Sequence, residues 1–165
     1  RRGVRTPHEY VADVFEMTLV RDMATRTVVA LRGEDTLGEM RNWLASGGPD
    51  ASHHGYPVLD ADDVLIGVLT QRDLRQSTVP ENAAVASLVC RPVRYVYEDC
   101  TLRQATDHLL NHDIGRLPVV SRELRPKLVG LLTRSDILAA QRRHVEESHT
   151  EPSTIVFGRA PIRRT

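Results

Sequence analysis

The sequence predicts an α/β (α+β) protein made of two copies of one unit, each a strand, a helix, two strands and a helix. Residues 67–74 (GVLTQRDL) return as residues 130–137 (GLLTRSDI), with the shared pattern Gly, two aliphatics, Thr, two variable residues, Asp and an aliphatic. A proline-containing aliphatic segment precedes each copy, YPVL at 56–59 and LPVV at 117–120. Landmarks that recur in the same order at a shared spacing indicate an internal duplication.

The first repeat is predicted to span residues 20–78. Its first helix has a clear start, because Thr36-x-x-Glu39 is a capping box, in which the two side chains bond free backbone N–H groups reciprocally. The pair Gly47-Gly48 ends that helix. In order, the expected elements are a strand at 27–31, the helix from Thr36, strands at 57–59 and 64–69, and a helix from Thr70.

The second repeat is predicted to span residues 85–143 and to copy this order. Thr101-x-x-Gln104 is again a capping box, and it lies where Thr36 lies in the first repeat. The recurrence of the box strengthens the case for a duplicated unit. The expected elements are a strand at 93–97, the helix from Thr101, strands at 118–120 and 128–132, and a helix from Thr133.

Three segments remain outside the repeats: an N-terminal arm at 1–19, a linker at 79–84 and a C-terminal tail at 144–165. Each repeat has about 60 residues, which is too few for a comfortable core of its own. A three-stranded sheet with helices on one face leaves its other face bare. The sequence therefore predicts that the two repeats pack sheet to sheet with pseudo-twofold symmetry.

Bulk composition narrows the possible functions. The 165 residues include 22 basic and 22 acidic side chains, and zero net charge argues against general nucleic-acid binding. The apolar runs are too short to cross a membrane. Cys90 and Cys100 are isolated, which fits a reduced, cytosolic setting. Because the chain begins without Met, we expect it to be a piece of a longer protein.

The paired motifs over residues 20–143 resemble a CBS-domain pair, also called a Bateman module. Residues 53–58 (HHGYPV), together with 115–122 and 133–136, resemble the cytoplasmic tails of bacterial chloride-channel (CLC) proteins. The resemblance implies a homodimeric regulatory module on the cytoplasmic side of the membrane, joined to an upstream transmembrane transport domain. It implies ATP, ADP or AMP as a regulatory ligand, with no certain cofactor.

The two Thr-x-x-Asp turns are the candidate ligand-binding features. A helix N-terminus offers free N–H groups and partial positive charge to a phosphate. In CBS pairs resembling this one, Thr contacts phosphate and Asp contacts the ribose diol; Arg72 and Arg134 lie beside the turns and could neutralise phosphate. The alternative interpretation is purely structural, because Thr-x-x-Asp also caps helices. Both interpretations stay open at this stage.

The resemblance implies two clefts, and the one containing Asp136 is favoured. His53 stands there where the family can have an aromatic residue that stacks on adenine, and Val28 stands where the family can have Thr. The favoured set is Val28, His53, His54, Tyr56, Pro57, Thr133, Arg134 and Asp136. The second set is Thr70, Arg72, Asp73, Val93, Ile114, Arg116 and Pro118.

Other chemistry finds little support. The pairs His53-His54 and His108-x-x-x-His112 lack nearby Cys or carboxylate ligands, so no metal site is expected. No catalytic constellation is present, and we expect no enzymatic activity. Two alternatives remain: a ligand-free dimerisation module that uses helix residues such as Trp43 or Leu110, or the regulatory pair of another host protein or enzyme.

Overall fold

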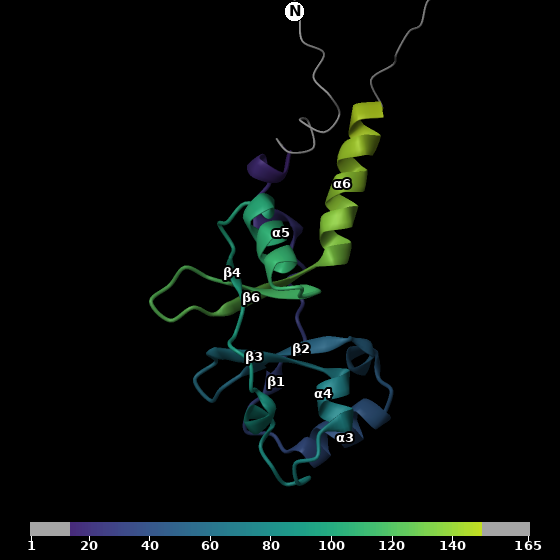
Figure 1. Cartoon of the computed structure of the whole chain (residues 1–165), viewed down its shortest axis with the longest axis vertical. Helices are drawn as coiled ribbons and strands as arrows, with labels where there is room; N and C mark the ends of the chain where they lie inside the picture. Colours follow the sequence, from purple (N-terminus) through teal and green to yellow (C-terminus); the bar gives the residue numbers. More distant parts are fainter. Residues whose placement is uncertain (1–13, 150–165) are drawn as a thin grey trace, which may run out of the picture.

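The computed structural model describes residues 14–149, which form two stacked lobes, each with one three-stranded sheet (Figure 1). In both sheets the first two strands are parallel and the last two are antiparallel. Predictions for the start of the arm and the end of the tail lie outside these residues. The first lobe has β1 (Leu31–Arg32), β2 (Gly55–Leu59) and β3 (Leu65–Thr70), and the second has β4 (Val96–Tyr97), β5 (Arg116–Val120) and β6 (Leu128–Thr133).

The principal helices cover the outer faces of the sheets, so the sheets face each other across the middle of the molecule (Figure 1). This arrangement confirms the predicted fold of tandem repeats packed sheet to sheet. The helices are α2 (Val20–Met23), α3 (Leu37–Ala45) and α4 (Gln71–Gln76), then α5 (Leu102–Asn111) and α6 (Arg134–His149), with 3-10 turns η1 (Pro49–Ser52) and η2 (Val85–Leu88).

Both predicted capping boxes are present. The Thr36 hydroxyl accepts the backbone N–H of Glu39, and the Glu39 carboxylate accepts that of Thr36. Thr101 and Gln104 make the same pair of bonds at the start of α5. Each box satisfies two donors that a helix N-terminus leaves free.

The strands predicted at 27–31 and 93–97 are shorter than expected. Only Leu31–Arg32 and Val96–Tyr97 pair with a neighbouring strand. The register explains this difference, because continuing each parallel pair backwards would set the next residue opposite Pro57 or Pro118. Proline has no backbone N–H to donate to the ladder, so the pairing begins one residue later.

The end of the arm and the start of the first repeat pack on the second lobe. The N–H of Val20 donates to Cys100 O at 2.9 Å. Thr25 and Leu131 exchange two backbone hydrogen bonds of 2.9 Å. Val20 is fully buried, and with Phe15 it belongs to the second lobe's core beside Leu102.

The start of the second repeat makes the complementary crossing onto the first lobe. The N–H of Val85 donates to Asp35 O at 2.8 Å, and that of Ala86 to Gly33 O at 2.9 Å. Val85 is fully buried in the first lobe's core, as Val20 is in the second. Each core is therefore completed by the segment that begins the other repeat. The repeat boundaries predicted from the sequence do not show this exchange.

The crossing of these two segments predicts which lobe each substitution will destabilise. Val20→Ala should lower the free energy of unfolding by about 2 kcal/mol, because it removes fully buried methyl groups. Hydrogen exchange should show the loss of protection first in α5, although Val20 belongs to the first repeat. Val85→Ala should instead act first on α3.

Val145→Ala is the matched control, since Val145 is 43% exposed, and it should change stability by less than about 0.5 kcal/mol. If the Val20 variant lost hydrogen-exchange protection at α3 before α5, that order would contradict the packing of Val20 on the second lobe.

Candidate functional site

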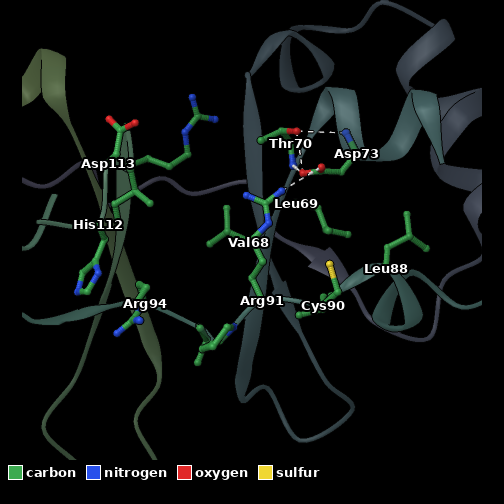
Figure 2. Close-up of a pocket in the computed structure, with 16 residues that line it drawn as sticks. Val68, Leu69, Thr70, Asp73, Leu88, Cys90, Arg91, Arg94, His112 and Asp113 are labelled. Atoms are coloured by element: carbon green, nitrogen blue, oxygen red, sulfur yellow. Dashed lines mark hydrogen bonds and ion pairs between the residues drawn. The ribbon is translucent and has the colours of Figure 1, made fainter. Parts of the chain in front are cut away.

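A cavity of about 520 Å³ lies between the two lobes (Figure 2). Three segments line it: the end of β3 with the start of α4, residues 88–94 ahead of β4, and residues 112–116 between α5 and β5. In Figure 2, Thr70 and Asp73 lie on one side and His112 and Asp113 on the other. Both repeats therefore contribute to one site.

The walls combine an apolar surface with a few polar groups. Val68 and Leu88 come from the first-lobe side, and Val93 and Ile114 from the second. Aliphatic surfaces of this kind can hold a flat ring by contact alone, while the polar groups fix its orientation.

The Thr70–Asp73 turn supplies a carboxylate that remains only partly engaged. The backbone N–H and the hydroxyl of Thr70 donate to Oδ2 of Asp73 at 2.8 and 2.7 Å, and the N–H of Asp73 donates to the Thr70 hydroxyl at 3.1 Å. The structural interpretation is thus correct, because this turn caps α4. Capping leaves Oδ1 of Asp73 facing the Arg91 guanidinium at 3.4 Å (Figure 2).

Three guanidinium groups line the cavity: Arg91, Arg94 and Arg116. Arg116 crosses to the first lobe, where its tip occupies the space that a Cβ on Gly55 would need. Burial lowers the pKa of the Arg116 guanidinium, and the nearby Tyr56 hydroxyl opposes that shift. Within residues 14–149, neither Arg94 nor Arg116 forms an ion pair.

The favoured set from the sequence does not surround this cavity. His53 and His54 are exposed ahead of β2, and Val28 is half-buried. The side chain of Tyr56 is fully buried in the first lobe's core, with its ring 5.3 Å from Trp43, so that it is not a cleft wall. The side chain of Pro57 is also buried.

The second turn repeats the geometry of the first. The Thr133 N–H and hydroxyl donate to Oδ2 of Asp136 at 2.7 and 2.8 Å. Arg134 is held by Asp113 at 3.0 Å. The two Thr-x-x-Asp turns are therefore locally alike, and the groups around them make the clefts different.

Most of the second set does meet in the cavity, namely Thr70, Asp73, Val93, Ile114 and Arg116. Two members do not line it: Arg72 is exposed and bonds Gln76 at 2.9 Å, and Pro118 is buried.

Sequence reasoning missed Arg91, Arg94, His112 and Asp113, all of which line the cavity. A usable signal existed for the first two, because Arg91 and Arg94 lie within two residues of Val93, which the sequence had already assigned to this cleft.

The remaining candidates have ordinary surroundings. The rings of His108 and His112 lie 4.6 Å apart, and within residues 14–149 no group of three or more His, Cys, Asp or Glu is placed to hold a metal ion. Trp43 is partly buried and packs against the first lobe's core. Among the described helices, none has the length and apolarity that a membrane crossing requires.

Comparison with known proteins establishes the family. The CBS domain model matches residues 20–79 and 85–143, so this chain belongs to the CBS-domain family and contains a CBS pair. The cytosolic domain of the Mg²⁺ channel MgtE, solved in complex with ATP, is 30% identical with a TM-score of 0.64, over 79% of this chain and 51% of that one.

Curated relatives place such pairs in different proteins. Inosine-5'-monophosphate dehydrogenase of Methanocaldococcus jannaschii is 28% identical over 134 residues, covering 81% of this chain but only 26% of the dehydrogenase. This chain thus spans about a quarter of that protein's length. Hypoxic response protein 1 of Mycobacterium tuberculosis is 27% identical over 136 residues, 79% of this chain and 87% of that protein.

A histidine beside the cavity gives a pH-dependence prediction, because the ring of His108 lies 4.6 Å from that of His112, which lines the cavity. Nε2 of His108 is buried without a hydrogen-bond partner in the described structure. Burial, then His112 and Arg94, lower the pKa of His108 below its ordinary value of 6.5. The unfolded chain therefore binds this proton more tightly, so stability is fully present above about pH 6.5 and falls as the pH drops through the folded pKa.

Urea midpoints between pH 7.5 and 5 should fall less steeply for His108→Gln than for the unmodified chain. His54→Gln, at an exposed position, should leave the slope unchanged. Identical slopes for the His108 variant and the parent would refute the assignment.

Proposed function

We propose that this chain is a regulatory, non-catalytic CBS pair that binds an adenine nucleotide in the cavity beside Asp73. The observation that carries the proposal is the cavity itself, which joins apolar walls from both repeats, a partly free carboxylate from the first repeat and three guanidiniums from the second. Its volume of about 520 Å³ lies within the range of about 300–1,000 Å³ typical of small-molecule sites. The ATP complex of the MgtE cytosolic domain supports the ligand class.

Each part of the nucleotide has a matching surface. Adenine lies between the aliphatic side chains of Val93 and Ile114. The ribose diol donates to Oδ1 of Asp73, the oxygen that capping leaves available. Phosphate oxygens accept charge-assisted bonds from Arg91, which moves from Asp73 to the ligand.

Regulation follows from the placement of the ligand between lobes. A molecule that contacts both repeats favours the arrangement in which both sets of contacts form, and it shifts the equilibrium only by its differential affinity. Coupling of this kind is worth about 1–3 kcal/mol. The end of the arm around Phe15 transmits this change to the attached domain. Phe15 is 9% exposed and packs in the second lobe's core, so a shift of that lobe moves the arm.

The host protein is the second part of the proposal. The sequence resemblance favours a CLC-type chloride channel or transporter, with this module on the cytoplasmic side of the membrane. The similarity to the cytosolic part of a Mg²⁺ channel supports an ion-transport host in general. The similarity to a dehydrogenase keeps an enzyme host as the alternative. None of the relatives named above is a chloride channel, so that host stays a prediction.

The Asp136 cleft remains the second candidate for the ligand, and the two turns allow a matched comparison. Asp73→Ala and Asp136→Ala each remove the same two bonds to a capping carboxylate and leave the backbone N–H bond to the Thr hydroxyl in place, so their costs in stability should be similar. Calorimetry with ATP, ADP and AMP should show that Asp73→Ala weakens binding by at least about tenfold, the loss of a charge-assisted bond.

Asp136→Ala should change affinity by less than about threefold, which is under 1 kcal/mol. The reverse order would move the site to the Asp136 cleft. No binding of any adenine nucleotide by the unmodified chain would reject the proposal.

A structural dimerisation role is the competing function, and two exposed side chains favour it. Leu110 on α5 is 67% exposed and Leu138 on α6 is 55% exposed, although both are large apolar residues. Trp43, the other dimerisation candidate from the sequence, is packed in its own lobe instead. If these leucines form a dimer contact, light scattering should show dissociation on dilution, and Leu110→Asp should give a monomer with nucleotide binding intact. A monomer at all concentrations would reject this role.

A further inference from the structure

The two clefts of this CBS pair differ in charge at positions that the fold makes equivalent. Gly55 pairs with Thr70 just as Arg116 pairs with Thr133, so Gly55 and Arg116 occupy the same place in the two repeats. Gly55 has no side chain, and the guanidinium of Arg116 reaches across the interface into the space beside it.

The segments ahead of β1 and β4 show the same asymmetry. Leu31 pairs with Val58 as Val96 pairs with Val119, so Arg91 and Arg94 correspond to Arg26 and Val29. Three guanidiniums line the Asp73 cavity. Only one of the equivalent positions, Arg26, keeps a positive charge around the Asp136 cleft.

Two of the guanidiniums meet the Thr70–Asp73 turn, one at each of its ends. Arg91 lies 3.4 Å from Oδ1 of Asp73. The tip of Arg116 lies over Gly55, the register partner of Thr70. Arg94 adds a third charge on the second-lobe side, beside His112 (Figure 2). A ribose bound at Asp73 would thus have its phosphates among cations.

The carboxylates of the cavity cancel this charge only in part, because Asp73 pairs with Arg91 alone. Asp113 is 96% exposed at its side chain and is already paired with Arg134, which does not itself line the cavity. Arg94 and Arg116 have no ion-pair partner within residues 14–149. The charge that remains without a partner favours an anion with more than one negative charge.

We propose that the Asp73 cavity selects adenine nucleotides with two or three phosphates over AMP and adenosine, and that Arg91 and Arg116 set this preference. The inference rests on the proposed function, since it names the phosphate number of the same ligand. Arg94 strengthens the attraction along the chain of phosphates. The Asp136 cleft, with one of the three charges, lacks this preference.

Calorimetric titration of the 165-residue chain with ATP, ADP, AMP, adenosine and inorganic tripolyphosphate tests the inference. EDTA keeps metal ions from neutralising the phosphates. ATP and ADP should bind at least about tenfold more tightly than AMP, and adenosine more weakly still. Raising the salt concentration should narrow the difference, because screening weakens interactions between exposed charges.

The ratio of the AMP dissociation constant to the ATP dissociation constant is measured for each arginine variant. If an arginine only supported the fold, its replacement would leave this ratio unchanged. Arg91→Gln should bring this ratio to within about threefold of one, and its side chain is 78% exposed, so the fold should survive. Arg116→Gln should do the same. Arg26→Gln, at the position equivalent to Arg91, is the matched control and should keep the ratio of the parent.

Each result separates this inference from the function on which it rests. Equal affinities for ATP, AMP and adenosine would overturn the phosphate preference while leaving the nucleotide site in place. An unchanged ratio in Arg91→Gln and Arg116→Gln would remove the role of these residues. Tripolyphosphate binding as tightly as ATP would make the cavity a polyanion site without adenine recognition. No binding of any nucleotide would defeat both proposals together.

Discussion

The structure depends on one constraint: two small sheets, each covered by helices on one face, must bury their other faces against each other. Each lobe has a core of its own, but a unit of about 60 residues buries too small a share of its surface to be more than marginally stable alone. Pro57 and Pro118 lie at equivalent buried positions, and each limits the parallel pairing of the neighbouring strand. Sheet closure then creates the space between the repeats where the cavity forms.

The exchange of leading segments ties the two lobes together. Val20 and Val85 occupy equivalent places, yet each lies in the core of the lobe that its own repeat does not build. The same crossing brings residues 88–94 onto the cavity wall, because η2 packs on the first lobe before the chain returns to β4. A ligand there touches the connection between the repeats as well as both lobes.

The duplication produced two similar Thr-x-x-Asp turns. The side chains around the turns give the two clefts different charges. The capping bonds at Thr70 and Thr133 are alike, so local structure cannot decide which cleft holds a ligand. The decision lies in residues beyond the turns. Gly55 has no side chain, and Arg116 takes up the room it leaves. The symmetry of the fold is thus compatible with one charged and one less charged site.

By itself, the sequence determined the duplication, the order of elements, the capping boxes and the family, because these depend on short-range patterns repeated at fixed spacing. It also gave Thr70, Asp73, Val93, Ile114 and Arg116 as one group, which the cavity brings together. Only the tertiary structure decided that Tyr56 is core and that Arg91 and Arg94 face the cavity. The positions of these side chains depend on how segments distant in the sequence cross between the lobes. A local sequence pattern does not predict which lobe a segment will pack against.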